Sequence, residues 1–345
     1  MANLRSMLFV PADSERKLAK GETSAADALI LDLEDSVAES RKPLAREMAA
    51  RFIAGRAAHI GPRLYVRINP LDTPFAMADL AAVVASGLAG VMLPKIRSAA
   101  DLVRLSHGLD ALEARAGLAA GSIAIVPVAT ETAEAMLTMG SFVGTPLPRL
   151  AGITWGAEDL STAIGAVANR DEDGQYSPLY QLAASLCLAA AAAAGASAID
   201  TLHADFKDSA GLAATSRASR RRGFRGRLAI HPDQVAPINA AYSPSEAELA
   251  HAAHRGRVRR QPGSRHAEPG RRDDRQAAPH AGAAHAGAGG LSVSAFADSL
   301  ATAFDLVQQA EPRLVQTVAL SLARQRHGDA RGVDVRLMPR ARCWR

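Results

Sequence analysis

Short apolar runs recur through the first two-thirds of the chain, each followed by a segment whose apolar residues have helical spacing. Each run is almost continuously apolar, which is typical of a parallel strand covered on both faces. Segments such as Ala76–Ser86, Ala99–Arg115 and Pro178–Ala194 are long enough for the helices that connect such strands. The alternation predicts βαβ units in one parallel sheet. The eight predicted strands are Ser6–Pro11, Ala28–Leu33, Arg63–Ile68, Gly90–Pro94, Ile123–Val128, Leu150–Trp155, Ala198–Leu202 and Arg227–Ile230.

Eight successive units favour a (β/α)8 TIM barrel, with an open doubly wound sheet as the alternative because periodicity alone does not show closure. The 345 residues are within the range of a single barrel. Hydrophobic residues make up 48% of the chain and aromatic residues 4%, so the large core must be built from aliphatic side chains. We expect the barrel in residues 1–250 and an irregular, disordered C-terminal region in residues 251–345.

Charge and cysteine content limit the classes of partner. The net charge of +5 is concentrated in Arg217–Arg227 and beyond Arg255. The run Arg220–Arg222 has no interleaved aromatic residues and no nucleic-acid motif around it, so we interpret it as a solvated helix end and expect no nucleic-acid partner. The cysteines Cys187 and Cys343 do not suggest a disulfide framework, and Cys187 fits a helix core better than a nucleophile.

Several features of other protein classes are missing from the sequence. No apolar run is long enough to span a bilayer, and Met1–Ser6 lacks a signal-peptide core, so we expect a cytoplasmic protein without a membrane partner. No G-x-S-x-G elbow, P-loop lysine or Rossmann G-x-G-x-x-G follows a predicted strand. The function must therefore come from other residues.

Polar side chains follow the predicted strands at the point where each strand ends. In a (β/α)8 barrel these ends converge on one face, where the active sites of such barrels lie. The alternative is that the residues cap the following helices, which suits Ser14, Asp101 and Asp233 but not glutamate, arginine or lysine. The strand-end residues are Asp32, Glu34, Asp35, Arg67, Asn69, Lys95, Glu131, Glu158, Asp159, His203, Asp205, His231 and Asp233.

Several carboxylates on one face, without a cysteine or histidine cluster, suit a hard cation such as Mg²⁺. Glu131 and Asp159 follow neighbouring strands and form the natural ligand pair. Arg67 has a planar guanidinium that can bind a substrate carboxylate through two hydrogen bonds. A bound cation and an arginine close together are the combination expected of a site that binds an anionic 2-oxo or 3-hydroxy acid. Spacing alone leaves open the alternative of unconnected carboxylates.

Eight motifs, in the same order along the chain, resemble those of the citrate lyase beta-subunit and malyl-CoA/citramalyl-CoA lyase family. The resemblance covers nearly everything from Arg5 to about His251. Such collinearity is far more specific than any single motif. The motifs are RSMLFVPAD at Arg5–Asp13, ALILDLEDSV at Ala28–Val37, YVRINP at Tyr65–Pro70, VMLPKI at Val91–Ile96, VPVATETAEA at Val126–Ala135, ITWGAEDLS at Ile153–Ser161, AIDTLHADFKD at Ala198–Asp208 and LAIHPDQV at Leu228–Val235.

The resemblance implies a barrel of the phosphoenolpyruvate-superfamily kind, with Mg²⁺ bound by Glu131 and Asp159. It implies catalytic roles for Arg67, Glu131 and Asp35, and contacts of Arg67, Glu131 and Lys95 with the substrate. Arg67 would bind the substrate carboxylate.

Members of this family cleave a 3-hydroxyacyl-CoA thioester to an acetyl thioester and an oxo acid, and some hydrolyse malyl-CoA. The resemblance therefore implies a Mg²⁺-dependent, aldolase-type carbon–carbon lyase acting on citramalyl-, malyl- or citryl-CoA, with a malyl-CoA thioesterase as the alternative. Asp32 and Glu34 would lie around the water shell of the metal, and Arg16 would contact the CoA phosphates. The resemblance leaves open whether the thioester carrier is CoA or an acyl-carrier protein. The expected products are acetyl-CoA and an oxo acid. The resemblance also implies a homotrimer or a multiple of it.

The family pattern stops after about Ala252, where the chain becomes rich in Arg, His and Gly. A shifted reading frame accounts for this change better than a genuine basic tail. Back-translation of Arg272–Ala278 with GC-rich codons, read one base later, yields Ala-Met-Ile-Asp-Lys-Pro, the usual C-terminal motif of the family. In lyases of the family the aspartate of this motif reaches a neighbouring subunit's site as a catalytic group. Its replacement around Arg275 raises a further alternative, a catalytically impaired barrel that binds Mg²⁺ and oxo acids.

Sequencing of the coding DNA around the codons for Ala250–Gly256 tests the reading-frame hypothesis. We expect codon usage to change at this point, and the other frame to continue the family pattern to a stop codon. A single frame without any shift in codon usage would show that the tail is genuine.

Overall fold

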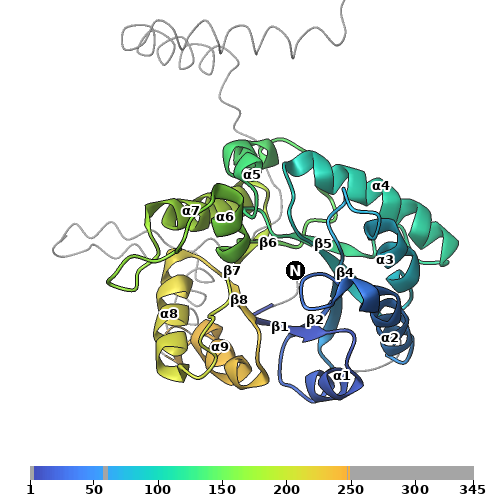
Figure 1. The fold of residues 1–345 in the computed structure, drawn as a ribbon, viewed down its shortest axis with the longest axis horizontal. Coiled ribbons are helices and arrows are strands. Elements are labelled where there is room, and N and C mark those ends of the chain that lie inside the picture. The colour runs from blue at the N-terminus through green and yellow to red at the C-terminus, as the bar shows by residue number, and fades with distance from the viewer. Residues whose placement is uncertain (1–3, 57–60, 247, 249–345) are drawn as a thin grey trace, which may run out of the picture. The chain divides into compact units, whose positions relative to one another are not determined.

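The computed structural model describes residues 4–56, 61–246 and 248, in which eight parallel strands form one sheet. The strand order is β5-β4-β3-β2-β1-β8-β7-β6, so β1 and β8 pair although they lie at opposite ends of the described chain. Figure 1 shows these strands inside a ring of helices. The strands are β1 (Ser6–Pro11), β2 (Ala28–Asp32), β3 (Arg63–Arg67), β4 (Leu88–Leu93), β5 (Ala124–Pro127), β6 (Gly152–Thr154), β7 (Ser197–Asp200) and β8 (Gly226–Ala229).

Backbone hydrogen bonds between the β5 and β6 segments close the sheet. The Ile125 N–H donates to the Arg149 carbonyl over 2.8 Å, and the Ala151 N–H donates to the Ile125 carbonyl over 3.0 Å. Farther along, the Ala129 N–H donates to the Thr154 carbonyl over 2.8 Å. These bonds confirm the (β/α)8 barrel and rule out the open doubly wound sheet.

Helices cover the outside of the barrel (Figure 1). The α4 helix begins with a capping box, in which the side chains of Ser98 and Asp101 satisfy N–H groups of the first turn. The α8 helix ends before Gly223, whose φ of 121° is in the region that favours glycine. The helices are α1 (Glu15–Glu22), α2 (Lys42–Ala54), α3 (Ala76–Val83), α4 (Ala99–Arg115), α5 (Ala133–Thr138), α6 (Glu158–Ile164), α7 (Pro178–Ala193), α8 (Ser209–Arg222) and α9 (Val235–Tyr242), with short 3₁₀ turns at Glu39–Arg41, Met139–Phe142 and Pro232–Gln234.

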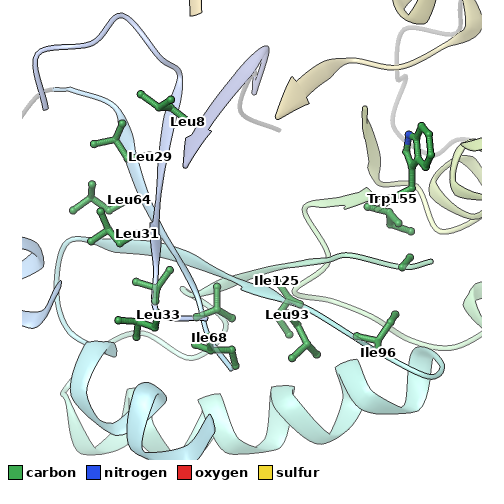
Figure 2. Close-up of a cluster of buried hydrophobic side chains, with 14 of the residues drawn as sticks. Leu8, Leu29, Leu31, Leu33, Leu64, Ile68, Leu93, Ile96, Ile125 and Trp155 are labelled. Carbon is green, nitrogen blue, oxygen red and sulfur yellow. The ribbon is translucent and has the colours of Figure 1, made fainter. Parts of the chain in front are cut away.

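Alternate residues of the strands contribute to two separate apolar clusters. In β2, Leu29 and Leu31 belong to the cluster between strands and helices, which Figure 2 shows in close-up. Ala28 and Ile30 belong to the second cluster, inside the barrel. Because side chains alternate along a strand, Asp32 continues the inward series and reaches the end of the barrel where the strands terminate.

The predicted strands and helices agree with the structure to within a few residues. Cys187 is fully buried in α7 as expected, and Arg221 and Arg222 are exposed at the end of α8. The capping interpretation fails for two residues, because the Ser14 side chain makes no cap hydrogen bond and Asp233 lies within a 3₁₀ turn. No helix in the described part of the chain is long and apolar enough to cross a membrane. The expected C-terminal region and the reading-frame hypothesis lie outside the described residues.

Gly90 makes room for the Tyr65 ring in the barrel interior. The two residues are paired in the register of β3 and β4, and Tyr65 is 2% exposed. A Cβ atom at position 90 would lie 2.5 Å from Tyr65 Cε1 and 2.8 Å from the Ala124 carbonyl oxygen. A side chain of any size at position 90 would therefore force the barrel wall to shift.

The variant Gly90→Ala is expected to lower the free energy of unfolding by about 1–3 kcal/mol, because overpacking strains a close-packed core. Gly108→Ala is the matched control, since nothing lies within 4 Å of a Cβ atom at that position of α4 and alanine has the higher helix propensity. Urea unfolding of the two variants measures the difference. A Gly90→Ala protein as stable as the wild type would contradict this account of the interior.

Candidate active site

A cavity of about 640 Å³ opens where strands β2 to β6 end. Loops after five successive strands contribute to it, which is the arrangement expected of an active site in a (β/α)8 barrel. Charged side chains of both signs gather in its wall. The lining residues are Glu34, Asp35, Val37, Lys42, Asn69, Pro70, Asp72, Thr73, Lys95, Arg97, Glu131, Thr132, Asp159, Thr162 and Ala163.

The Arg67 guanidinium is anchored beneath this cavity by Asp32. The two residues stand opposite each other in the register of β2 and β3. Arg67 Nε donates to Asp32 Oδ1 and Nη2 donates to Asp32 Oδ2, each over 2.7 Å, so the pair is bidentate. The guanidinium carbon also lies 4.8 Å from the centroid of the Phe9 ring, in a cation–π contact. These contacts set the direction of the guanidinium.

Two further carboxylates connect Arg67 with Lys95. Arg67 Nη1 lies 2.9 Å from Glu34 Oε2 and 3.4 Å from Asp35 Oδ2. Lys95 Nζ donates to Glu34 Oε1 and, over 3.2 Å, to Asp35 Oδ1. The same ammonium lies 3.4 Å from Asp159 Oδ1. Positive and negative groups therefore alternate across the floor of the cavity.

The backbone of Lys95 contacts the other member of the expected metal pair. Its N–H donates to Glu131 Oε2 over 2.6 Å. Lys95 has a φ of 52°, the left-handed region that non-glycine residues seldom adopt, and it is the one such residue in the described part of the chain. Such conformations cost free energy and are concentrated at functional sites.

Arg67 and Lys95 influence the protonation of the carboxylates around them. Burial acts to raise the pKa of Asp32, but the hydrogen bonds and charge of Arg67 outweigh burial and hold this pKa below its usual value. Burial also acts to raise the pKa of Asp35, but the charge of Arg67, a hydrogen bond with Glu34 and the charge and hydrogen bond of Lys95 together lower it. Glu34 is more deeply buried than Asp35, and burial, with the charge of Asp35, outweighs the two cations and raises the pKa of Glu34 to about 7.

Glu131 is a buried carboxylate without a cationic partner among the described residues. Burial and, after it, the charge of Asp159 raise the pKa of Glu131 well above its usual value. A cation between the two carboxylates would offset both effects by favouring the ionised forms, and carboxylate oxygens are the donors that Mg²⁺ prefers. The residues present therefore fit a divalent cation.

The candidate metal site is a pair of carboxylates rather than a complete cage. Within residues 4–56, 61–246 and 248, no group of three or more Asp, Glu, His or Cys side chains is placed to hold one metal ion. Mg²⁺ typically uses one or two protein carboxylates and leaves the other positions to water and substrate. Glu131 and Asp159 would match that mode of binding.

Most of the residues expected from the sequence to form the site lie together. Arg16 is the exception, because it is exposed on α1 and does not line the cavity. Arg67 does not line the cavity itself, but it contacts Glu34 and Asp35, which do. The expected site residues that the contacts above connect are Asp35, Arg67, Lys95, Glu131 and Asp159.

The strand-end histidines do not line this cavity either. His203 Nε2 lies 3.4 Å from Asp208 Oδ2, and His231 stacks on Phe206 with ring centroids 4.8 Å apart. Glu34, which the sequence placed only near the water shell of the metal, links both cations of the site. The equal lengths of β2 and β3 are the signal that could have placed Asp32 opposite Arg67.

Fold and site define a class of (β/α)8 barrel with an acidic cavity at the carboxyl ends of its strands. Residues 5–232 match the model of the HpcH/HpaI aldolase/citrate lyase family, and the chain belongs to this family. A (3S)-malyl-CoA thioesterase of Cereibacter sphaeroides is 35% identical over 246 residues, which are 71% of this chain and 79% of the relative. A citrate lyase subunit beta-like protein of Mycobacterium tuberculosis is 37% identical over 244 residues, which are 70% and 80% of the two chains.

Solved structures agree with this assignment. The M. tuberculosis citrate lyase beta subunit complexed with oxaloacetate and magnesium has a TM-score of 0.59 and 33% identity, over 70% of this chain and 98% of the other. The M. tuberculosis protein CitE in complex with magnesium, acetoacetate and coenzyme A has a TM-score of 0.61 and 33% identity, over 77% and 91% of the two chains. The expected family and barrel are confirmed, and both neighbours are complexes with the metal expected from the sequence.

The variant Glu131→Gln is expected to stabilise the metal-free protein at neutral and alkaline pH. A carboxyl group with a higher pKa in the folded than in the unfolded state contributes stability that is complete below the unfolded pKa. That contribution is lost as the pH rises through the folded pKa, and glutamine cannot titrate. Thermal unfolding in EDTA should show the wild-type midpoint falling progressively below that of the variant as the pH rises above the ordinary pKa of a glutamate. If the midpoints of the two proteins changed with pH in parallel, the raised pKa of Glu131 would be contradicted.

Proposed function

We propose that the protein is a Mg²⁺-dependent carbon–carbon lyase that cleaves a 3-hydroxyacyl-CoA thioester of the citramalyl, malyl or citryl type. The products would be acetyl-CoA and an oxo acid. The main support is that Glu131 and Asp159 lie beside Lys95 in the cavity of a citrate lyase family barrel. When bound, Mg²⁺ would supply a Lewis acid for the hydroxyl and carboxylate oxygens of the substrate.

Four side chains would bind the metal and the substrate carboxylate. Glu131 and Asp159 would hold the metal. The Nη1 end of Arg67 and the ammonium of Lys95 would attract the substrate carboxylate. In the structure the two cations both contact Asp35, so a substrate carboxylate would exchange with an existing carboxylate partner and would not enter an uncompensated positive site.

Asp35 is the group to which we assign the hydroxyl proton of the substrate. Its side chain is 50% exposed in the cavity wall, and Arg67, Glu34 and Lys95 together outweigh burial and lower its pKa, so it is ionised at neutral pH. When the proton passes to Asp35, the adjacent carbon–carbon bond breaks and the hydroxyl carbon becomes the carbonyl of the oxo acid. The electron pair remains on the thioester fragment as an enolate, which then takes up a proton.

The thioester carrier would bind at the same end of the barrel. Arg16 lies near the start of α1, just after β1 ends, and is exposed to solvent. We assign it to the CoA phosphates, and delivery by an acyl-carrier protein is the alternative. A homotrimer or a multiple of it and a cytoplasmic location also remain predictions.

A malyl-CoA thioesterase is the second candidate function. The relative of Cereibacter sphaeroides carries the name (3S)-malyl-CoA thioesterase. Hydrolysis would leave the carbon skeleton intact and would use the same cavity and thioester. A third candidate, an impaired barrel that binds Mg²⁺ and oxo acids without turnover, follows from the reading-frame hypothesis.

Product analysis with malyl-CoA and citramalyl-CoA, in Mg²⁺ or in EDTA, distinguishes these functions. We expect Mg²⁺-dependent formation of acetyl-CoA with glyoxylate or pyruvate. The variant Glu131→Gln should lose about 100-fold or more of the rate while it remains folded, since even groups outside the ligand shell of a metal affect activity by about 10–100-fold.

Free CoA with an intact hydroxy acid would instead establish the thioesterase. No turnover, with Mg²⁺ and oxo-acid binding retained, would establish the impaired barrel. Unchanged activity in Glu131→Gln would contradict the metal assignment.

A further inference from the structure

Lys95 contacts both carboxylates of the proposed metal pair, through different parts of the residue. Its backbone N–H donates to Glu131 Oε2 over 2.6 Å, and its ammonium lies 3.4 Å from Asp159 Oδ1. The left-handed backbone at φ 52° allows the N–H to reach one carboxylate while the side chain reaches the other. The same residue therefore holds both sides of the pair.

The ammonium of Lys95 is the only cationic group of the described residues in an ion pair with Asp159. The other cation of this cluster of charges, Arg67, is held by Asp32 and Glu34 and forms no such pair with Asp159. Around Asp159, the positive charge of the unloaded protein therefore comes from Lys95. A divalent cation bound to Asp159 would meet this charge within a few ångströms, where two cations repel strongly in a partly buried site.

We propose that Lys95 is a built-in counter-ion for Asp159, which a divalent cation must displace when it binds to this carboxylate. The proposal rests on the metal pair of the proposed function. It adds that Lys95 compensates the charge of Asp159 when no metal is bound. The Glu131 side is preformed, because its hydrogen bond comes from the backbone. The Asp159 side changes partner, because a flexible ammonium that is 30% exposed can withdraw.

Withdrawal of the ammonium leaves it with existing partners. Glu34 and Asp35 both contact Lys95 Nζ, the latter at 3.2 Å. The displaced charge therefore stays within the cavity instead of being left in an apolar environment. Lys95 thereby keeps the metal-free site ordered but competes with a cation for Asp159. Removal of its charge should therefore tighten cation binding.

Binding of Mn²⁺, measured by electron paramagnetic resonance on the full chain, tests this exchange. Lys95→Met retains the stem and the backbone N–H but loses the charge, so we expect at least about tenfold tighter binding than in the wild type. Lys95→Arg retains the charge and should bind within about threefold of the wild type. Arg97→Met is the matched control, since it removes a positive charge from the same cavity wall that pairs with Asp72 and not with Asp159.

A second readout needs no bound cation. The thermal midpoint of Lys95→Met in EDTA should fall below that of the wild type, and added Mg²⁺ should raise it by more than it raises the wild-type midpoint. Lys95→Gln replaces Lys95→Met in both measurements if the methionine variant does not fold.

The outcomes separate the exchange from the metal site itself. Wild-type binding of Mn²⁺ with equal or weaker binding by the neutral Lys95 variant (Lys95→Met, or Lys95→Gln in its place) would overturn the exchange and leave the metal site in place. An equal gain in Arg97→Met would also overturn it, because the effect would then be general to the cavity. If neither the wild type nor any variant bound Mn²⁺, the metal site of the proposed function would fail and the exchange with it.

Discussion

The bidentate pairing of Asp32 with Arg67 is the contact on which the site depends. A buried guanidinium is tolerated only when its charge and its donors are matched, and Asp32 satisfies two of its nitrogens from the neighbouring strand. The remaining nitrogen is thereby directed to Glu34 and Asp35, which in turn contact Lys95. Register within the barrel wall thus determines the order of charges in the cavity above it.

Much of this arrangement could be predicted from the sequence, because it depends on chain direction and periodicity. Continuous apolar runs specified parallel strands, and parallel strands in a barrel bring Lys95, Glu131 and Asp159 to one end. Eight collinear motifs identified the family, which the match over residues 5–232 confirms. Closure of the sheet into a barrel depends on hydrogen bonds between the β5 and β6 segments, and the spacing of apolar residues along the sequence does not indicate such bonds.

The parts that the sequence did not reveal are those set by side-chain geometry. Nothing in the motif around Lys95 indicates a left-handed backbone, or that its N–H and ammonium contact different carboxylates. Glu34 was placed at the edge of the site, but its burial and its contact with two cations make it central. Arg16 lies on an exposed helix surface, so its proposed contact depends on a ligand whose position the fold alone does not specify.

A crystal of the full chain soaked in Mn²⁺, with anomalous diffraction recorded at the manganese edge, tests the central point that the acidic cavity is a divalent metal site. The account predicts one strong anomalous peak within coordination distance of a Glu131 oxygen and an Asp159 oxygen, with the Lys95 ammonium withdrawn from Asp159. A peak elsewhere, or no peak in the cavity with Lys95 still paired to Asp159, would contradict it.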